Sequence, residues 1–598
     1  MSLLWVSLLL GCGHRAPPED LCTGGWCWTW PEQTGATLTH VVARSADEAV
    51  VLAQGGLVLS WDGRFRVLHE GDVPLHALTL APDGQVWVAG EGGVVRRFDG
   101  ESWHDVDAGT DAQLNDLWVG DDTWWAAGEK GRKGVLVTPG EITEVDHQMY
   151  SVTMTADGPV FGGQIGHALR PSAEGDEPEL SFVLPQGMTI EMLPPNMRPP
   201  EPAPWVELWD WEPTLPSWDG ATSDGSGTVW LMGNNVLDDI YEVRRRVDGV
   251  WETLPVDGAE GLRGMTGGER PWVVGLGPRA TPGVWRFDGT AFVPVDAVER
   301  RGMVTYLHDV ATADGATWVV GENGLLLRDR GEGFERLSGT DISQDIEGLG
   351  GEAFRAAPHD GEVLAWSKKR GWAPVTEVHT PTATGPVAMD PTGGVWIGAS
   401  DGLRRFDGEA WTTWPGDRAT RLVAPAPDRA YAVVNGQLRR FTGSAWELEA
   451  GPSGVRELWA TGEAMLVGGA DFLAWRSSPE AEWEVIEVTT GRHGPGALAA
   501  TGRDDIWFTA GGELHHHDGQ TTEVVAVPEA MKAGRHLRAL RAAPGEVWVT
   551  GSDGLVLRYA QGTWTDLSVV GASYLYGLTL TDEEVWVYGR NAILRRTR

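Results

Sequence analysis

The sequence predicts an all-β fold built from repeated four-stranded units, and three observations support this prediction. A motif of the form V-W-V-x-G recurs in fourteen copies, strong or weak, along the 598 residues. Neighbouring copies lie 34 to 46 residues apart, except for a gap of 69 residues between Phe161 and Trp230. Each copy is flanked by further short apolar runs and a Gly turn. Such a period is typical of a supersecondary unit repeated many times.

Each unit contains four expected strands, illustrated by residues 75–106. The first is LHALTL (75–80) and the second is VWVAG (86–90), which is apolar almost without alternation and therefore covered on both faces. The third, GVVRRFDG (93–100), ends in Asp-Gly and leads to an aromatic fourth strand, SWHDV (102–106). Asp-Gly predicts a hairpin with a type I′ turn, in which both central residues have positive φ.

A four-stranded sheet of about 40 residues, sandwiched by its neighbours, is a β-propeller blade. Fourteen blades predict two tandem seven-bladed β-propellers, over residues 36–340 and 341–598. The copy DPTGGVWIGASDGLRRF (390–406) resembles the two-component regulator propeller repeat. In that family, fourteen repeats form two seven-bladed rings, often as the extracytoplasmic sensor of a histidine kinase.

The N-terminus has the pattern of an export signal. An apolar run from Leu3 to Leu10 is too short to span a bilayer and has the length of a signal-peptide core. LLGC (9–12) resembles the lipobox of bacterial lipoproteins, which implies a signal peptide over residues 1–11 and lipid attachment at Cys12. The alternative is a plain secretory signal. We expect an exported protein held in the cell envelope by lipid, with secretion as the alternative.

The remaining cysteines, Cys22 and Cys27, lie within residues 12–35, between the expected anchor and the first blade. In an oxidising compartment they are expected to form a disulfide. The spacing CxxxxC, with no following His or second Cys pair, disfavours metal or haem binding, and no cofactor is predicted.

The last unit ends at Arg598 after its third strand, whereas CWTWP (27–31) resembles a spare fourth strand. One hypothesis pairs residues 27–31 with 325–329, which would leave 334–338 free to pair with 592–597. The alternative is simple local pairing of 325–329 with 334–338. Either arrangement must hide strand edges that would otherwise be exposed.

The 69-residue gap predicts an insertion. We expect a fourth strand near 180–184 and then a proline-rich loop over 186–214. Trp205, Trp209 and Trp211 lie in this loop, out of register with the repeat, and are the candidate ligand-binding residues. The alternative is that the loop packs against its own blade.

Most other residues with binding chemistry have structural explanations. Sixteen tryptophans fall in the second-strand or fourth-strand position of a unit and are expected to pack between blades. His515, His516 and His517 are expected to be solvated at a strand end, with metal binding as the alternative. Repeated Arg-Arg pairs are expected to face water or a neighbouring blade. No catalytic or metal-binding motif is recognisable, and no catalytic residue is predicted.

The formal charge of −38, from 47 Lys and Arg against 85 Asp and Glu, disfavours a nucleic-acid partner. The favoured hypothesis is a non-catalytic, envelope-anchored lipoprotein that binds a glycan or protein or acts as a scaffold. It is expected to be a monomer that meets the membrane only through its lipid. The alternatives are a polysaccharide-active enzyme on a propeller frame and a periplasmic sensor module for a separate kinase.

Overall fold

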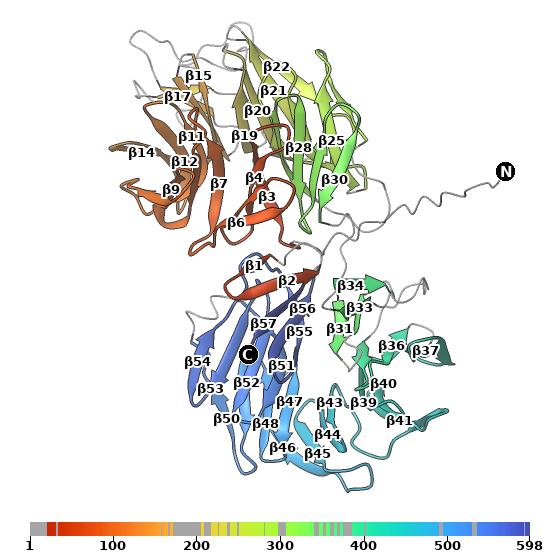
Figure 1. The fold of residues 1–598 in the computed structure, drawn as a ribbon. Coiled ribbons are helices and arrows are strands. Elements are labelled where there is room, and N and C mark those ends of the chain that lie inside the picture. Colours follow the sequence, from red (N-terminus) through yellow and green to blue (C-terminus); the bar gives the residue numbers. More distant parts are fainter. Residues whose placement is uncertain are drawn as a thin grey trace, which may run out of the picture.

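A computed structural model shows the protein as two stacked rings of β-sheets (Figure 1). The described residues are 21–30, 34–156, 158–164, 168–171, 205–208, 217–224, 227–235, 240–247, 250–279, 281–296, 306–339, 346–350, 355–358, 364–367, 371–374, 386–399, 402–488, 494–528, 535–590 and 592–598. Within these residues the strands form thirteen four-stranded sheets and one five-stranded sheet, all antiparallel between neighbours. The prediction of an all-β fold with two tandem seven-bladed propellers is confirmed.

Ring one contains seven blades, each made of four consecutive strands. They are β3–β6 (Leu38–Ala43, Ala49–Ala53, Leu57–Trp61, Phe65–His69), β7–β10 (Leu75–Leu80, Val86–Gly90, Val95–Phe98, Trp103–Val106), β11–β14 (Gln113–Val119, Trp124–Lys130, Lys133–Thr138, Glu141–Val145), β15–β18 (Met149–Thr155, Gly158–Gly163, Ala168–Pro171, Trp205–Leu208), β19–β22 (Ser217–Ser223, Val229–Asn235, Ile240–Val247, Val250–Pro255), β23–β26 (Gly261–Met265, Trp272–Gly277, Thr281–Phe287, Phe292–Pro294) and β27–β30 (Leu307–Ala313, Ala316–Gly321, Leu326–Asp329, Phe334–Ser338). A short 3-10 turn, η1 (Glu91–Gly93), follows β8.

Ring two contains six blades of four consecutive strands and a seventh that is completed from the N-terminus. The six are β31–β34 (Ile346–Gly350, Arg355–Pro358, Leu364–Ser367, Gly371–Pro374), β35–β38 (Val387–Met389, Val395–Ala399, Gly402–Phe406, Trp411–Pro415), β39–β42 (Arg421–Ala426, Arg429–Val434, Gln437–Phe441, Trp446–Leu448), β43–β46 (Glu457–Thr461, Ala464–Gly468, Phe472–Arg476, Glu484–Glu487), β47–β50 (Leu498–Gly502, Asp505–Ala510, Glu513–His517, Thr522–Val525) and β51–β54 (Leu537–Ala543, Glu546–Gly551, Val556–Ala560, Thr563–Asp566). The seventh joins β55 (Leu575–Leu580), β56 (Glu584–Gly589) and β57 (Ala592–Thr597) to β2 (Trp26–Trp30) and β1 (Cys22–Thr23).

The apolar second strands favour this fold because they are buried between neighbouring blades. Every residue of β4, β28 and β52 is buried, as expected for strands covered on both faces by neighbouring blades. The Asp-Gly segments at 99–100 and 407–408 do form the hairpins that follow the third strands, but not with type I′ turns. Gly100 and Gly408 have φ of 105° and 115°, whereas Asp99 and Asp407 are not among the described non-glycine residues with positive φ.

The aspartates shape these turns through their side chains. The Asp99 carboxylate accepts hydrogen bonds from the backbone N–H groups of Glu101 at 2.8 Å and Ser102 at 2.9 Å. Asp407 accepts the same two bonds, at 2.9 Å each, from Glu409 and Ala410. At these two turns the type I′ prediction is therefore wrong, because the loop holds four residues and the Asp side chain satisfies its donors.

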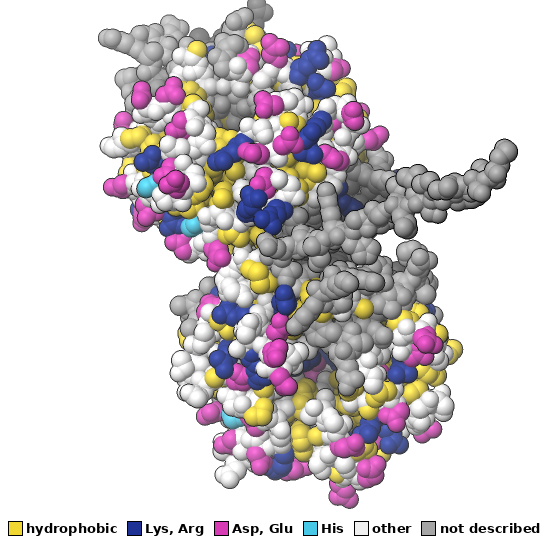
Figure 2. Space-filling view, viewed as in Figure 1, with side chains coloured by type: hydrophobic (Ala, Val, Ile, Leu, Met, Phe, Trp, Pro, Cys, Tyr) yellow, Lys and Arg dark blue, Asp and Glu magenta, His cyan; other side chains and the backbone are white. Residues whose placement is uncertain are grey.

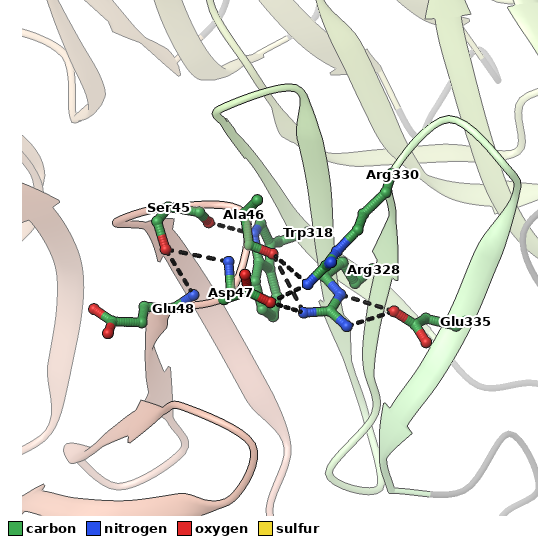
Figure 3. A network of polar contacts seen from close by, with 8 residues as sticks. All are labelled: Ser45, Ala46, Asp47, Glu48, Trp318, Arg328, Arg330 and Glu335. Atoms are coloured by element: carbon green, nitrogen blue, oxygen red, sulfur yellow. Dashed lines mark hydrogen bonds and ion pairs between the residues drawn. The ribbon is translucent and has the colours of Figure 1, made fainter.

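Ring one closes through side chains at the seam between its last and first blades (Figure 3). The indole Nε1 of Trp318 donates to the carbonyl of Ser45 at 3.2 Å. The guanidinium of Arg328 lies over the Trp318 ring, donates to Asp47 at 3.1 Å and also to Glu335 at 2.6 Å. The blade β27–β30 is complete by itself, so this seam needs no borrowed strand.

Ring two closes by a strand borrowed from the other end of the chain. Figure 1 shows β2, in red, lying beside the blue strands of the C-terminal blade. Cys27 pairs with Arg595 and Trp28 with Leu594 in an antiparallel register. The hypothesis that residues 27–31 pair with 325–329 is wrong, because β29 pairs locally with β30 and β57 pairs with β2. The spare strand completes the last blade instead, and it pairs the edge that β57 would otherwise expose.

One hydrophobic core runs through the junction of the two rings. It joins Trp61 and Trp318 of ring one to Trp548 and Leu575 of ring two, with Trp26 among the same buried residues. The backbone N–H of Gly24 also donates to the Glu70 carboxylate of ring one at 2.9 Å. The strand that closes ring two therefore contacts both rings.

The predicted insertion contains the fourth strand of its blade. β18 (Trp205–Leu208) pairs with β17, so it takes the place that we expected residues 180–184 to fill. The expectation of a loop through 205–208 is corrected accordingly, while 180–184 lies outside the described residues. A strand can be recruited across so long an excursion because the cost of closing a loop grows slowly with its length.

No helix among the described residues is long and apolar enough to cross a membrane. On the face shown in Figure 2, acidic and basic side chains are interspersed over both rings. The described part of this face therefore carries no single large basic patch, in agreement with the excess of acidic residues in the chain.

Candidate functional site

The tryptophans of the second strands pack between blades, as predicted. Trp230, Trp318 and Trp396 are fully buried. Several of these rings carry the guanidinium of the residue directly opposite on the third strand, as Arg405 does over Trp396 at 5.3 Å. These tryptophans, and the arginine of an Arg-Arg pair that lies over such a ring, therefore stabilise the blade.

A second aromatic residue recurs near the start of the fourth strand, opposite the last or the penultimate residue of the third strand. We call this the outer aromatic position. Its ring packs on an aromatic residue across the hairpin, with centroids 5.2 Å apart for Phe98 and Trp103 and 4.9 Å apart for Tyr559 and Trp564. These fourth-strand tryptophans are half-buried, as expected for residues near the rim of a blade.

In some blades, the indole at the outer aromatic position also links its blade to the preceding one. Nε1 of Trp103 donates to the carbonyl of Leu68 at 2.8 Å. Nε1 of Trp564 donates to the carbonyl of Ala526 at 2.9 Å. The acceptor lies at or just beyond the end of the fourth strand of the preceding blade. Each such bond satisfies the indole N–H while the ring fills the gap between blades.

The blade β47–β50 lacks this aromatic residue, and a groove of about 510 Å³ lies at its junction with the preceding blade. Thr522 occupies the outer aromatic position, opposite His517. The groove is bounded on one side by the fourth strand of the preceding blade, Glu484 to Glu487, and by Val488 just after it. The described residues lining its other side are Arg503, His515, His517, Gly519, Gln520, Thr522 and Val524.

Two imidazoles belong to this groove. His515 is buried and stacks on Phe508 with centroids 4.9 Å apart. His517 is 5% exposed, and its Nδ1 lies 3.0 Å from the hydroxyl of Thr522. Its Nε2 is buried and has no hydrogen-bond partner among the described residues. Burial lowers the pKa of His517, so the ring is neutral at pH 7 and Nε2 can meet a donor or an acceptor.

The expectation that His515 and His517 are solvated is therefore wrong. They replace an arginine and a phenylalanine of the repeat and point into the junction between blades. His516 faces the other way, stacks on Trp507 with centroids 4.1 Å apart and lies 2.9 Å from Asp505. No group of three or more His, Cys, Asp or Glu residues placed to hold a metal occurs in the part of the chain that the structure describes.

The arginine at the groove is already paired. Arg503 donates to Glu484 at 2.7 Å across the blade junction and to Asp504 at 2.7 Å. Besides these pairs, the groove presents the two histidines, Gln520, Thr522 and Glu487, and the exposed Val485 and Val524 lie beside them. The groove therefore suits a group that combines an apolar surface with a hydrogen-bond donor.

A second groove, of about 500 Å³, lies where the blade β11–β14 meets its predecessor. Its third and fourth strands are joined by the short turn Pro139-Gly140, so this blade has no outer aromatic residue either. The lining includes Asp111, Lys130 and Glu144, and Lys130 pairs with Asp111. Both grooves thus mark blades in which the indole is missing, but only the first contains buried imidazoles.

Polar groups also gather at the inner strands of ring one. His40, His76 and His308 lie on the consecutive inner strands β3, β7 and β27. Burial lowers the pKa of His40 and His308 to about 4, and proximity to His308 adds to the effect at His40. These histidines are neutral at pH 7. Nε2 of His76 and of His308 is buried without a hydrogen-bond partner in the described residues.

Two carboxyls of the same ring connect neighbouring inner strands. Asp309 accepts the N–H of Val41 at 2.9 Å, and Asp116 accepts the N–H of Val152 at 2.8 Å. Each follows a β-bulge in its strand. Burial raises the pKa of Asp309 to about 7 and that of Asp116 to about 6, although these backbone hydrogen bonds act in the opposite direction. Through these hydrogen bonds, Asp309 and Asp116 hold the inner strands of neighbouring blades in place.

The candidate residues from the sequence that the structure describes, Trp205, Cys22 and Cys27, line neither groove. Trp205 belongs to β18, the fourth strand of its blade, while Trp209, Trp211 and Cys12 lie outside the described residues. Cys22 and Cys27 form a disulfide across the β1–β2 hairpin. The groove at Thr522 was missed by sequence reasoning, although the absence of an aromatic residue there is visible when the repeats are aligned.

Comparisons with solved structures agree with the fold. The chain is similar to PorZ, a bacterial surface component of the type-IX secretion system of Porphyromonas gingivalis, with a TM-score of 0.56 and 12% identity over 94% of this chain and 86% of that one. It is also similar to an ancestral GH74 enzyme, with a TM-score of 0.61 and 11% identity over 96% of this chain and 99% of that one. No protein-family model and no curated protein matches the chain. At these identities the likeness establishes the propeller fold alone.

Proposed function

We propose that this chain is an exported lipoprotein that is anchored in the bacterial cell envelope through Cys12 and acts as a non-catalytic binding or scaffolding module for a glycan or protein. The observation that carries the binding role is the groove beside Thr522. It has a volume of about 510 Å³, buried imidazole groups and exposed apolar residues at its rim. Pockets of this size and mixed character are typical of ligand sites.

The N-terminal features support the proposed location. The lipobox-like LLGC precedes a chain whose next two cysteines form a disulfide, and disulfides persist in oxidising compartments. The anchor precedes β2, the strand that closes ring two and contacts ring one. A lipid at Cys12 would therefore hold the two-ring body close to the membrane surface.

The anchor is tested by expressing the full chain and the Cys12→Ser variant in a bacterium supplied with a labelled fatty acid. We expect label and membrane association in the parent chain, and an unlabelled, soluble product in the variant. Equal fractionation of the two proteins, with no label in either, would contradict the anchor and favour plain secretion.

The non-catalytic role is tested with a panel of polysaccharides, in which retention and product release are measured together. We expect no released oligosaccharide. Release would favour a polysaccharide-active enzyme, which needs one protonated and one ionised carboxyl at a suitable spacing. Asp309 and Asp116, whose pKa values are raised by burial, would then be the first residues to replace.

A further inference from the structure

We propose that the groove beside Thr522 is a receptor for the indole ring of a tryptophan residue presented by a partner polypeptide. The inference rests on the proposed binding function and specifies its ligand. It starts from the repeat itself, because the groove occupies the place that an indole of the chain's own fourth strand fills in other blades.

The first argument is the geometry of the empty position. In the next blade, Trp564 packs on Tyr559 across the hairpin and donates Nε1–H to the carbonyl of Ala526, just after the fourth strand of the preceding blade. At the groove, Val488 lies just after the fourth strand of its blade and His517 takes the place of Tyr559. An indole placed in the groove would meet an aromatic ring and a carbonyl acceptor in this arrangement.

The second argument is that the groove is more than a packing defect, because hydrogen-bonding groups line the space that the missing aromatic ring leaves. Thr522 is smaller than the residue it replaces, and no other described aromatic ring fills the space that this leaves. The two imidazoles are buried, and Nε2 of His517 has no partner among the described residues. Arg503 is held by Glu484 and Asp504, so a strongly anionic ligand finds no unpaired cation there.

The third argument favours a polypeptide over a free aromatic metabolite. The groove lies between β46 and β50, the outermost strands of two blades. Val485 on β46 is 58% exposed and Val524 on β50 is 52% exposed. An extended peptide can pair with an outermost strand while its side chains contact these valines, and its tryptophan enters the groove.

The test uses a peptide with the sequence of residues 562–568, GTWTDLS, which is the chain's own fourth strand around Trp564. Binding to the purified protein is measured by calorimetry and by saturation-transfer NMR. The same peptide with leucine in place of tryptophan and the small molecule N-acetyl-tryptophanamide are the two comparison probes. We expect the tryptophan peptide to bind at least ten times more tightly than either probe.

Two variants of the protein make the result specific. Thr522→Trp places an indole in the groove and is expected to weaken peptide binding at least tenfold, while it keeps or raises the thermal midpoint because it restores the link to the preceding blade. Glu523→Trp adds the same ring to the other face of β50 and is expected to leave binding within twofold. Equal loss in both variants, or unchanged binding in Thr522→Trp, would overturn the proposal.

The remaining outcomes are also decisive. Absence of binding by the tryptophan peptide at millimolar concentration overturns the proposal without touching export or anchoring, which the Cys12→Ser experiment tests separately. Equal binding of the leucine peptide would show that the groove does not recognise indole. Equal binding of N-acetyl-tryptophanamide would show that the ligand is an aromatic small molecule and would overturn the polypeptide assignment.

Discussion

Replacing Trp26 with alanine is expected to open ring two while ring one stays folded. Trp26 lies on β2, is 0% exposed and belongs to the core at the junction of the rings. Its Nε1 donates to the carbonyl of Leu567 in the preceding blade at 2.6 Å. Loss of a buried indole costs about 4 kcal/mol, and loss of its hydrogen bond costs about 1 kcal/mol. Together they approach the whole stability of many domains, which is about 5–15 kcal/mol.

The assay is calorimetric unfolding combined with hydrogen exchange resolved by segment. For a ring of this size, about 5 kcal/mol corresponds to a fall of about 10–20 °C in the midpoint of the ring-two transition. Amide protection should fall in β55–β57 and in β31–β34, which flank the borrowed strand. Trp103→Ala is the matched control, because it removes a half-buried outer indole from ring one.

Two results would refute this reasoning. One is a Trp26→Ala protein whose ring-two transition lies within about 2 °C of the parent protein, a shift far smaller than the buried indole requires. The other is a loss of protection in β27–β30 of ring one while ring two stays protected. Either would mean that β2 does not close ring two in solution.

Three further predictions concern other parts of the frame. The free energy of unfolding of Asp309→Asn, relative to that of the parent protein, should rise by about 2 kcal/mol between pH 5 and pH 8. The folded-state pKa of Asp309 is raised to about 7, so the parent protein loses stability as the pH rises to that value. A constant difference between the two proteins across this range would contradict the assignment. Arg328→Met should destabilise ring one by about 1 kcal/mol, because Glu335 loses this partner and Asp47 keeps only Arg330 at the seam. The change is measured against the exposed control Arg66→Met, and equal midpoints would contradict the seam. Replacing both Cys22 and Cys27 with serine should lower the midpoint of ring two by an amount equivalent to about 2 kcal/mol, and a reducing agent should reproduce the loss in the parent but not in the variant.

The blades were predictable because their signal is local. The near-continuous apolar second strand and the Asp-Gly hairpin lie within about 40 residues of each other, so the pattern alone indicates a sheet covered on both faces. The same local signal failed at the turn itself. Asp-Gly also suits a loop in which the Asp side chain accepts two backbone N–H groups, and residues 99–102 adopt that loop.

The candidate site was harder to predict because its properties come from two blades. Thr522 can be recognised from the sequence as a missing aromatic residue, but the burial of His515 and His517 depends on β46 of the preceding blade. Sequence reasoning therefore placed these histidines in solvent. It placed the candidate ligand-binding residues in the proline-rich segment instead, where Trp205 proved to lie on the strand β18.

The amino-acid sequence by itself determined most of the strands, their grouping into fourteen sheets and the presence of a spare strand near the N-terminus, because each of these follows from side-chain patterns within one repeat. It did not determine β18, which is reached only across the long insertion. Only the tertiary structure decided where the spare strand pairs. Residues 325–329 and 592–597 are both apolar strands that can accept a neighbour, and local propensity does not distinguish them. The choice follows from long-range packing: β30 already covers β29, while β57 has an open edge that β2 fills by burying Trp26 and Trp28 in the core shared by the two rings.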